Sequence, residues 1–231
     1  LNLATSFEFG PKGVYVLQPP YLLYYADEDH DDKPDGKPEV LLEGFGIEDT
    51  HALVSSLTWG PDGWLYGSQG STVSSKIKIP GSDQPSIDRI GQLMWRYHPT
   101  RKIYEVFAEG GGNLWSCEFD SKGRLFSGHN GSTPGSYYLP GAYYAKTFKK
   151  HGEFSNPYVY GHLPSIDHPG WKRLSTNVAV YEGGKLPKRF EGSLLWANTL
   201  LHTVGASTLT SAGLNFRSEY LDPLLSGDAP L

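Results

Sequence analysis

The apolar residues of this chain fall into short runs that are separated by turns rich in glycine and proline. Two such runs, residues 93–97 and 103–108, flank the polar segment Pro99-Thr100-Arg101, which predicts two antiparallel strands joined by a turn. No segment repeats its apolar residues at helical spacing over three turns, and only residues 142–150 have the character of a short helix. The pattern therefore predicts an all-β chain.

A repeated unit organises these predicted strands. Residues 56–67 read SLTWGPDGWLYG and residues 116–127 read SCEFDSKGRLFS, so that a serine, an aromatic residue, a turn glycine and a leucine–aromatic pair recur. Residues 8–16 repeat the unit upstream, and residues 190–196 resemble it more weakly. Because Gly63 supplies a positive φ after Pro61, each unit reads as a tight turn that leads into a strand.

The repeat predicts the fold class and the domain organisation. Units of this length with about four strands each are typical of β-propeller blades. We expect residues 1–231 to form one propeller domain of about four blades, placed equivalently around Gly13, Gly63 and Gly123, with Trp59 and Phe119 in matching positions. Since closed propellers have about four to eight blades, we expect a fragment that is truncated at both ends. The alternative is a β-sandwich with chance similarity between its strands.

Composition and charge exclude several functional classes. The net charge is −5 and no basic run is present, so a nucleic-acid partner is not expected. No apolar stretch approaches the ~20 residues that a membrane-spanning helix needs. The single cysteine, Cys117, excludes an internal disulfide and a zinc cage built from cysteines.

The aspartates of one acidic loop are spaced as the ligands of a calcium site are. Asp27, Asp29, Asp31 and Asp35 occupy the odd positions at which a loop wraps oxygen ligands around Ca²⁺. Asp32 stands where the EF-hand loop has a glycine, and aspartate tolerates the left-handed backbone of that position. Crowded carboxylates repel one another unless a cation neutralises them. The sequence predicts calcium at these four aspartates, and the alternative is a solvated acidic turn.

The candidate catalytic and ligand-binding residues lie in two loops at equivalent places of successive repeats. His51 precedes the strand pair that begins near Ser56, and the neighbouring Glu48 and Asp49 can orient its ring. Asn113 and Trp115 occupy the matching loop of the next repeat, where an asparagine can present a donor and an acceptor to a ligand. The alternatives are an ordinary surface histidine and an asparagine that serves a turn.

Several long motifs resemble a known group of proteins. They are GVYVLQPP, the DxDxD loop, VLLEGFGIEDTH, LTWGPDGWLYGSQG and YGHLP, which occur in this order over nearly the whole chain. Together they resemble the propeller domain of large membrane-bound dehydrogenase-like proteins of planctomycetes and verrucomicrobia. That group is distantly similar to the soluble quinoprotein glucose/sorbosone dehydrogenases. The resemblance implies a six-bladed type of propeller for the full protein, with pyrroloquinoline quinone and calcium as cofactors.

The resemblance also implies roles for individual residues. The dehydrogenases have a histidine before the turn sequence GPDG that takes the proton of the sugar hydroxyl, and His51 is the nearest match, one residue further from Gly60 than their pattern has it. Asn113 and Trp115 match cofactor-binding positions of a later blade. Gly112 stands where that pattern has an arginine. A quinone that accepts hydride needs a fixed cation, so this departure puts the chemistry in question.

Two functions follow from these expectations. The first is a sugar or polyol dehydrogenase that uses the quinone, with His51 as the catalytic base, an exported or periplasmic location and a haem-binding domain of the full protein as electron acceptor. The second is a non-catalytic propeller that binds a carbohydrate or a protein partner in its central channel. A cation facing the channel near His51 favours the enzyme, whereas a channel of neutral and aromatic groups favours the binding module.

Overall fold

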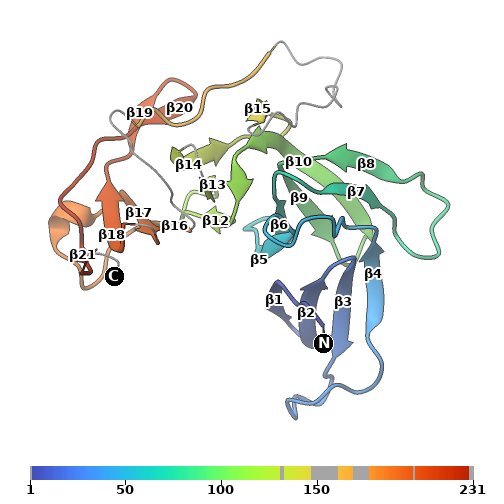
Figure 1. The fold of residues 1–231 in the computed structure, drawn as a ribbon. Helices are drawn as coiled ribbons and strands as arrows, with labels where there is room; N and C mark the ends of the chain where they lie inside the picture. The colour runs from blue at the N-terminus through green and yellow to red at the C-terminus, as the bar shows by residue number, and fades with distance from the viewer. Residues whose placement is uncertain (1, 131–132, 147–160, 169–176, 200, 229–231) are drawn as a thin grey trace.

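The computed structural model describes residues 2–130, 133–146, 161–168, 177–199 and 201–228 (Figure 1). Across these residues the protein is all-β, as predicted, and one 3-10 turn at Lys188–Phe190 is the single helical element described. Within the described part of the chain, no helix is long and apolar enough to cross a membrane. Three further features matter for the site: the order of the strands, the turns between them and the packing of successive sheets.

The strands form four successive sheets whose members follow one another in the chain. The first sheet consists of β1 (Ser6–Gly10), β2 (Gly13–Gln18), β3 (Tyr21–Ala26) and β4 (Glu39–Glu43). The second consists of β5 (Ser55–Trp59), β6 (Leu65–Gln69), β9 (Leu93–His98) and β10 (Ile103–Gly111), with β15 (Tyr143–Lys146) added in parallel along β10.

The third and fourth sheets continue this pattern. In the third, β13 (Leu125–Asn130) pairs on one side with β11 (Asn113–Leu114) and β12 (Glu118–Phe119) and on the other with β14 (Thr133–Tyr138). The fourth consists of β16 (Val178–Tyr181), β17 (Ser193–Asn198), β18 (Thr203–Ser207) and β21 (Leu225–Ser226). Two separate hairpins are β7 (Ser74–Ile77) with β8 (Ile87–Ile90), and β19 (Thr210–Ala212) with β20 (Asn215–Arg217).

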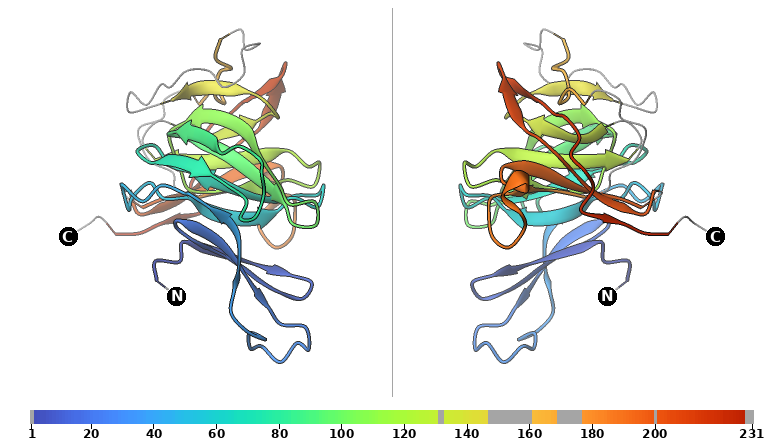
Figure 2. Two further views of the ribbon diagram at one scale, coloured as in Figure 1. Left: turned by 90° about the vertical axis from the view of Figure 1, so that its right-hand side faces the viewer. Right: turned by 90° about the vertical axis from the view of Figure 1, so that its left-hand side faces the viewer.

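The four sheets lie side by side along an arc, with β1, β5, β12 and β16 towards the concave side (Figure 1). Strand β1 contacts β5, and β12 contacts β16, so the inner strands of successive sheets are neighbours. In both views of Figure 2 the first sheet, in blue, lies below the other three sheets.

The repeated turns are equivalent in the structure. The amide of Gly63 donates to the carbonyl of Gly60 at 3.0 Å, and sixty positions later the amide of Gly123 donates to that of Asp120 at 2.9 Å. Gly63 has φ 78° and Gly123 has φ 73°, so both need the left-handed backbone that glycine adopts readily. Gly63 lies between β5 and β6 and Gly123 lies between β12 and β13, whereas Gly13 is the first residue of β2, directly after the turn that follows β1.

Successive sheets share apolar cores. Tyr15 of the first sheet packs edge-on against Trp59 of the second, with ring centroids 5.4 Å apart, and Tyr66 of the second packs in the same way against Phe119 of the third at 4.9 Å. The predicted correspondence of Trp59 and Phe119 thus appears as a repeated contact between sheets. Edge-to-face pairs contribute about 0.5–1.5 kcal/mol beyond the area they bury, so the same interaction stabilises each of these two interfaces.

The segment expected to form a short helix at residues 142–150 contains a strand instead. Tyr143–Lys146 is β15, which pairs in parallel with β10, and residues 147–150 lie outside the described residues. Tyr143, Tyr144 and Lys146 are buried, whereas Ala145 is exposed. Tyrosine favours strands, and pairing along β10 outweighs the weak helical character that alanine and lysine confer on the segment.

Candidate functional site

A cavity of about 440 Å³ opens where the inner edges of the four sheets meet. We call it the central pocket. Every sheet contributes to it, either through its first strand or through the loop that leads into that strand. The described residues that line it are Thr5, Ser6, Thr50, Leu53, Ser55, Ser56, Trp115 and Asn177.

The lining of the central pocket is uncharged and rich in hydroxyl groups. Five of its residues are serines or threonines, and Asn177 adds an amide. Ser6 accepts a hydrogen bond from the amide of Leu57 at 2.9 Å, which joins the first sheet to the second at the wall of the pocket. The indole nitrogen of Trp115 is buried and has no hydrogen-bond partner among the described residues. An unpaired buried N–H is costly, so a polar partner for Trp115 would stabilise this wall of the pocket.

A backbone irregularity brings two adjacent serines to this wall. The pairing of β5 with β6 shifts register between Ser55 and Thr58, and Ser56 has φ 62°. In a regular strand neighbouring side chains point to opposite faces, whereas here Ser55 and Ser56 both line the pocket. A non-glycine residue in the left-handed region costs on the order of 1–3 kcal/mol, and such strain is concentrated at functional sites.

Asn113 holds the His51 loop in place. Its side-chain nitrogen donates to the carbonyl of His51 at 2.7 Å, and its side-chain oxygen accepts from the amide of Ser71 at 3.0 Å. Asn113 is 7% exposed, so this amide joins three loops from inside the protein. The two loops predicted to lie together do so, and the contact runs through the backbone of His51.

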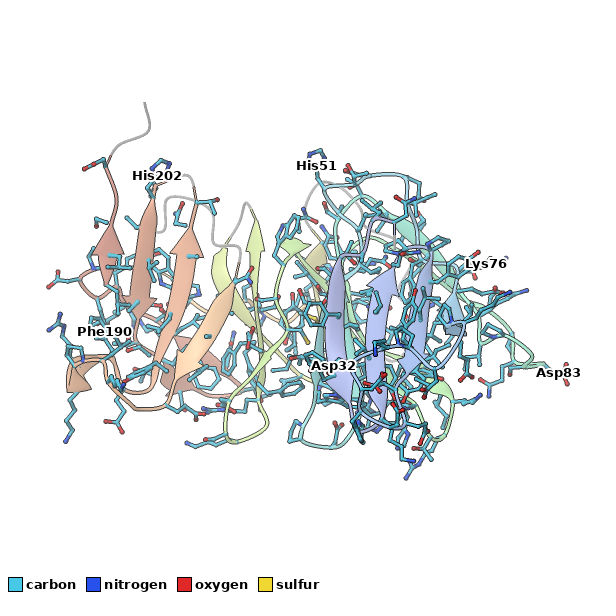
Figure 3. The ribbon with its side chains drawn as sticks, turned by 90° about the horizontal axis from the view of Figure 1, so that it is seen from below. Asp32, His51, Lys76, Asp83, Phe190 and His202 are labelled. Carbon is cyan, nitrogen blue, oxygen red and sulfur yellow. The ribbon has the colours of Figure 1, made fainter. Side chains whose placement is uncertain are left out.

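The His51 ring itself points to solvent. Its side chain is 90% exposed, and Nδ1 lies 3.3 Å from Oδ1 of Asp49. Figure 3 shows the ring at the outer rim of the loop. Hydrogen bonds from Thr72 and from the His51 amide lower the pKa of Asp49, which keeps that carboxylate charged beside the ring. The neighbouring Thr50, rather than His51, lines the central pocket, and a catalytic role for His51 stays a prediction.

Of the predicted cofactor-binding pair, Trp115 lines the central pocket and Asn113 does not appear among its lining residues. Gly112, which stands where the dehydrogenase pattern has an arginine, directly precedes Asn113, and Leu114 between the pair is a core residue that is 1% exposed. No cation lines the pocket in the described part of the chain. As described, the pocket does not fit an anionic quinone that requires a fixed positive charge.

The acidic loop brings three of its four predicted ligands together. Carboxylate oxygens of Asp27, Asp29 and Asp31 lie within 4.8 Å of one another. Asp35 is not part of this group, and its carboxylate accepts a hydrogen bond from the amide of Glu28 at 2.7 Å. Calcium binding at these residues stays a prediction.

Two residues of the acidic loop adopt the left-handed backbone conformation. Asp32 has φ 63° and His30 has φ 59°, so the aspartate in place of the EF-hand glycine adopts the left-handed conformation. Lys33 pairs with Asp31 at 2.8 Å and partly neutralises the cluster. Figure 3 places Asp32 and His51 at opposite ends of the first sheet, so this loop is separate from the central pocket.

Sequence reasoning did not identify the serine and threonine wall. The repeat includes Ser56, but nothing in the repeat marks it as a lining residue. Serines are common in turns and strands, and nothing in their spacing distinguishes Ser55 and Ser56 from the others. The available signal for the pocket wall was a pair of adjacent serines at the start of an inner strand. It indicates a lining pair only when the register shift between β5 and β6 is known.

Comparison with known proteins identifies a family. The model of a domain of unknown function, DUF7133, matches residues 1–228. No curated protein matches the chain in sequence. Among solved structures, a glucose dehydrogenase-type oxidoreductase from Thermus thermophilus is 14% identical, with a TM-score of 0.48, over 99% of this chain and 86% of that one.

Two further solved structures are similar at the same level. The aldose sugar dehydrogenase of Streptomyces coelicolor, solved with bound pyrroloquinoline quinone, is 16% identical, with a TM-score of 0.49, over 96% of this chain and 62% of that one. The soluble aldose sugar dehydrogenase of Escherichia coli, in its apo form, is 11% identical, with a TM-score of 0.46, over 97% of this chain and 87% of that one. Because the family model spans nearly the whole sequence, the chain belongs to the DUF7133 family.

Proposed function

We propose that residues 1–231 form a single β-propeller domain of the sugar-dehydrogenase type, whose central pocket binds a carbohydrate or polyol. The observation that carries this proposal is the lining of the pocket: hydroxyl groups on the inner strands and a buried indole N–H without a partner among the described residues. The four sheets with neighbouring inner strands support the blade arrangement.

The chemistry of the lining suits a neutral polyhydroxyl ligand. Hydroxyl side chains both donate and accept, so they match the mixed donors and acceptors of a sugar. The indole of Trp115 offers a donor and an apolar face. A charged ligand would lose its hydration without gaining an opposite charge in this pocket, which is costly. Of the two functions expected from the sequence, carbohydrate binding is the one that this lining supports directly.

Oxidation of the bound hydroxyl is the second candidate. Asn113 holds the His51 backbone at 2.7 Å beside the pocket residue Thr50, and the Asp49 carboxylate lies 3.3 Å from the His51 ring. A histidine paired with a carboxylate is suited to act as a general base. For this function His51 would have to turn inward, and a cation for the quinone would have to come from outside the described lining. An exported location and a haem-binding electron acceptor belong to this candidate.

We also propose that the acidic loop binds Ca²⁺ through Asp27, Asp29 and Asp31, with Asp35 joining when an ion is present. Hard carboxylate oxygens are the ligands that calcium prefers, and three of them already converge. Calorimetric titration of the intact protein should show saturable calcium binding that Asp29→Asn weakens at least tenfold. Asp83→Asn, in the turn of the β7–β8 hairpin, is the matched control. The absence of calcium heat in the intact protein would contradict this proposal.

Sugar binding is tested by isothermal titration calorimetry with glucose and sorbitol. Trp115→Phe keeps the apolar ring but removes the N–H, and we expect it to weaken binding about fivefold, the value of one hydrogen bond of roughly 1 kcal/mol. Trp64→Phe is the control, because that ring stacks on Arg96 away from the pocket. If no neutral sugar or polyol in such a panel binds the protein, the proposal is wrong.

A dye-reduction assay with quinone and calcium separates the two candidates. Oxidation by the intact protein that His51→Ala reduces by a factor of about 10² to 10⁴ would support the enzyme. Saturable sugar binding without dye reduction would leave the binding module as the function.

A further inference from the structure

A second cavity, of about 350 Å³, lies at the outer edge of the second sheet, away from the central pocket. It is enclosed by β8, β10 and the turn that leads into β15, three elements that lie together in Figure 1. We call it the edge cavity. Its walls are mostly apolar and aromatic, and its lining includes Ile87, Val106, Phe107 and Ala142 together with Arg89 and Glu109.

A buried ionic cluster forms one wall of the edge cavity. Glu109 is 2% exposed; its Oε1 accepts from the Tyr143 hydroxyl at 2.8 Å and lies 3.0 Å from Nε of Arg89. Its Oε2 accepts from Lys146 at 3.1 Å. The Lys146 side chain is itself 6% exposed and also donates to the carbonyl of Ile90 at 2.8 Å. Two cations therefore share a single carboxylate in a setting largely removed from water.

Arg89 is the incompletely satisfied member of this cluster. Its side chain is 25% exposed, and its Nη1 donates to the carbonyl of Asp88 at 2.7 Å. Its buried Nε makes no well-aligned hydrogen bond, and among the described residues Nη2 has no partner. Glu105 also lines the cavity, but Arg96 holds its carboxylate at 2.7 Å, so it does not neutralise Arg89.

From this arrangement we infer that the edge cavity is a binding site for a small carboxylate with an apolar or aromatic body. Arg89 is partly buried and, among the described residues, shares the single carboxylate of Glu109 with Lys146, so an anion in the cavity would balance the remaining positive charge. The guanidinium fork is matched in shape to a carboxylate. The apolar walls accept the body of the ligand, and the cavity has the volume of a site for a small molecule. The site is independent of sugar binding, because it shares no lining residue with the central pocket.

Benzoate is a suitable probe, because it joins a carboxylate to a ring of the right size. Calorimetry at constant ionic strength should show saturable binding of about one benzoate per chain, with at least tenfold weaker binding of the uncharged analogue benzamide. Arg89→Gln should weaken benzoate binding at least tenfold. Arg101→Gln, which removes the same charge at an exposed turn, should leave the affinity unchanged.

Three outcomes would overturn the inference. One is the absence of benzoate binding in the intact protein, with or without a loss of thermal stability in Arg89→Gln, which would make the cluster a purely structural ion-pair network. Another is an equal loss in Arg89→Gln and Arg101→Gln, which would indicate general electrostatic attraction. The third is tight binding of inorganic phosphate that excludes benzoate, which would assign the site to a different anion. Because Arg89→Gln can affect folding, Tyr143→Phe provides a second variant. It removes the hydroxyl that donates to Oε1 of Glu109, so that this oxygen competes more strongly with benzoate for Arg89 and benzoate binding should weaken.

Discussion

Replacing Asn113 tests whether one buried amide positions the loops around the central pocket. In Asn113→Ala the amide of Ser71 and the carbonyl of His51 lose the partners they have at 3.0 and 2.7 Å. Ser71 is 4% exposed, so water cannot replace its partner freely. A lost hydrogen bond costs about 1 kcal/mol and an unsatisfied buried group about 1–3 kcal/mol, so we expect a loss of roughly 2–4 kcal/mol in the free energy of unfolding.

Urea unfolding measures this loss, with Asn2→Ala as the control, because the structure gives the exposed Asn2 side chain no hydrogen bond. Asn113→Asp adds a pH test. A carboxylate facing the His51 carbonyl would be repelled, so its folded-state pKa should be raised above the unfolded value of about 3.9. The folded state then binds more protons, and stability should fall as the pH rises from about 4 through the raised pKa. If Asn113→Ala unfolds at the same urea concentration as Asn2→Ala, the positioning role is wrong.

Two further predictions concern stability. In Gly110→Ala the new Cβ would lie 1.9 Å from the carbonyl oxygen of Tyr144 at a φ of 102°, so we expect the free energy of unfolding in urea to fall by about 3 kcal/mol or more. The control Gly141→Ala, at φ 71° with no atom within 4 Å, should lose only about 1–2 kcal/mol. Equal losses in the two variants would refute the steric argument. Burial lowers the pKa of His168 to about 4. The unfolded state then binds more protons than the folded state, so the free energy of unfolding should fall by on the order of 2–3 kcal/mol as the pH drops from 6.5 towards 4. If His168→Gln has the same pH profile as the intact protein, another group is responsible.

The sequence repeat predicted the parts of the fold that depend on local turn chemistry. Gly63 and Gly123 lie in turns with the same hydrogen bonds because proline or aspartate, followed by glycine, specifies the turn within a few residues. The short helix expected at residues 142–150 was wrong where the structure describes that segment. Tyr143–Lys146 pairs with β10, a strand far away in the sequence, and no local pattern reveals that pairing.

The site was less predictable, because it depends on contacts between distant segments. Trp115 could be predicted as a site residue from its place in the loop. The role of Asn113 as a link between loops depends on Ser71 and His51, which lie 42 and 62 positions away in the sequence. The pairing of β15 with β10, and with it the burial of Lys146 beside Glu109, likewise joins residues that no local pattern connects. Resemblance to dehydrogenases drew attention to His51, whereas the pocket wall beside it consists of ordinary serines and threonines.

The shared cores between successive sheets have a consequence for folding. Each sheet is stabilised largely by its neighbours, so the array should behave as a linear chain of coupled units, in which the inner members open less often than the outer ones. Phe7 and Phe9 on the first sheet are 61% and 68% exposed, whereas Trp95 of the second is fully buried. Amide exchange should therefore be slowest in β6 and β9 and faster in β1, with protection graded along the arc rather than uniform.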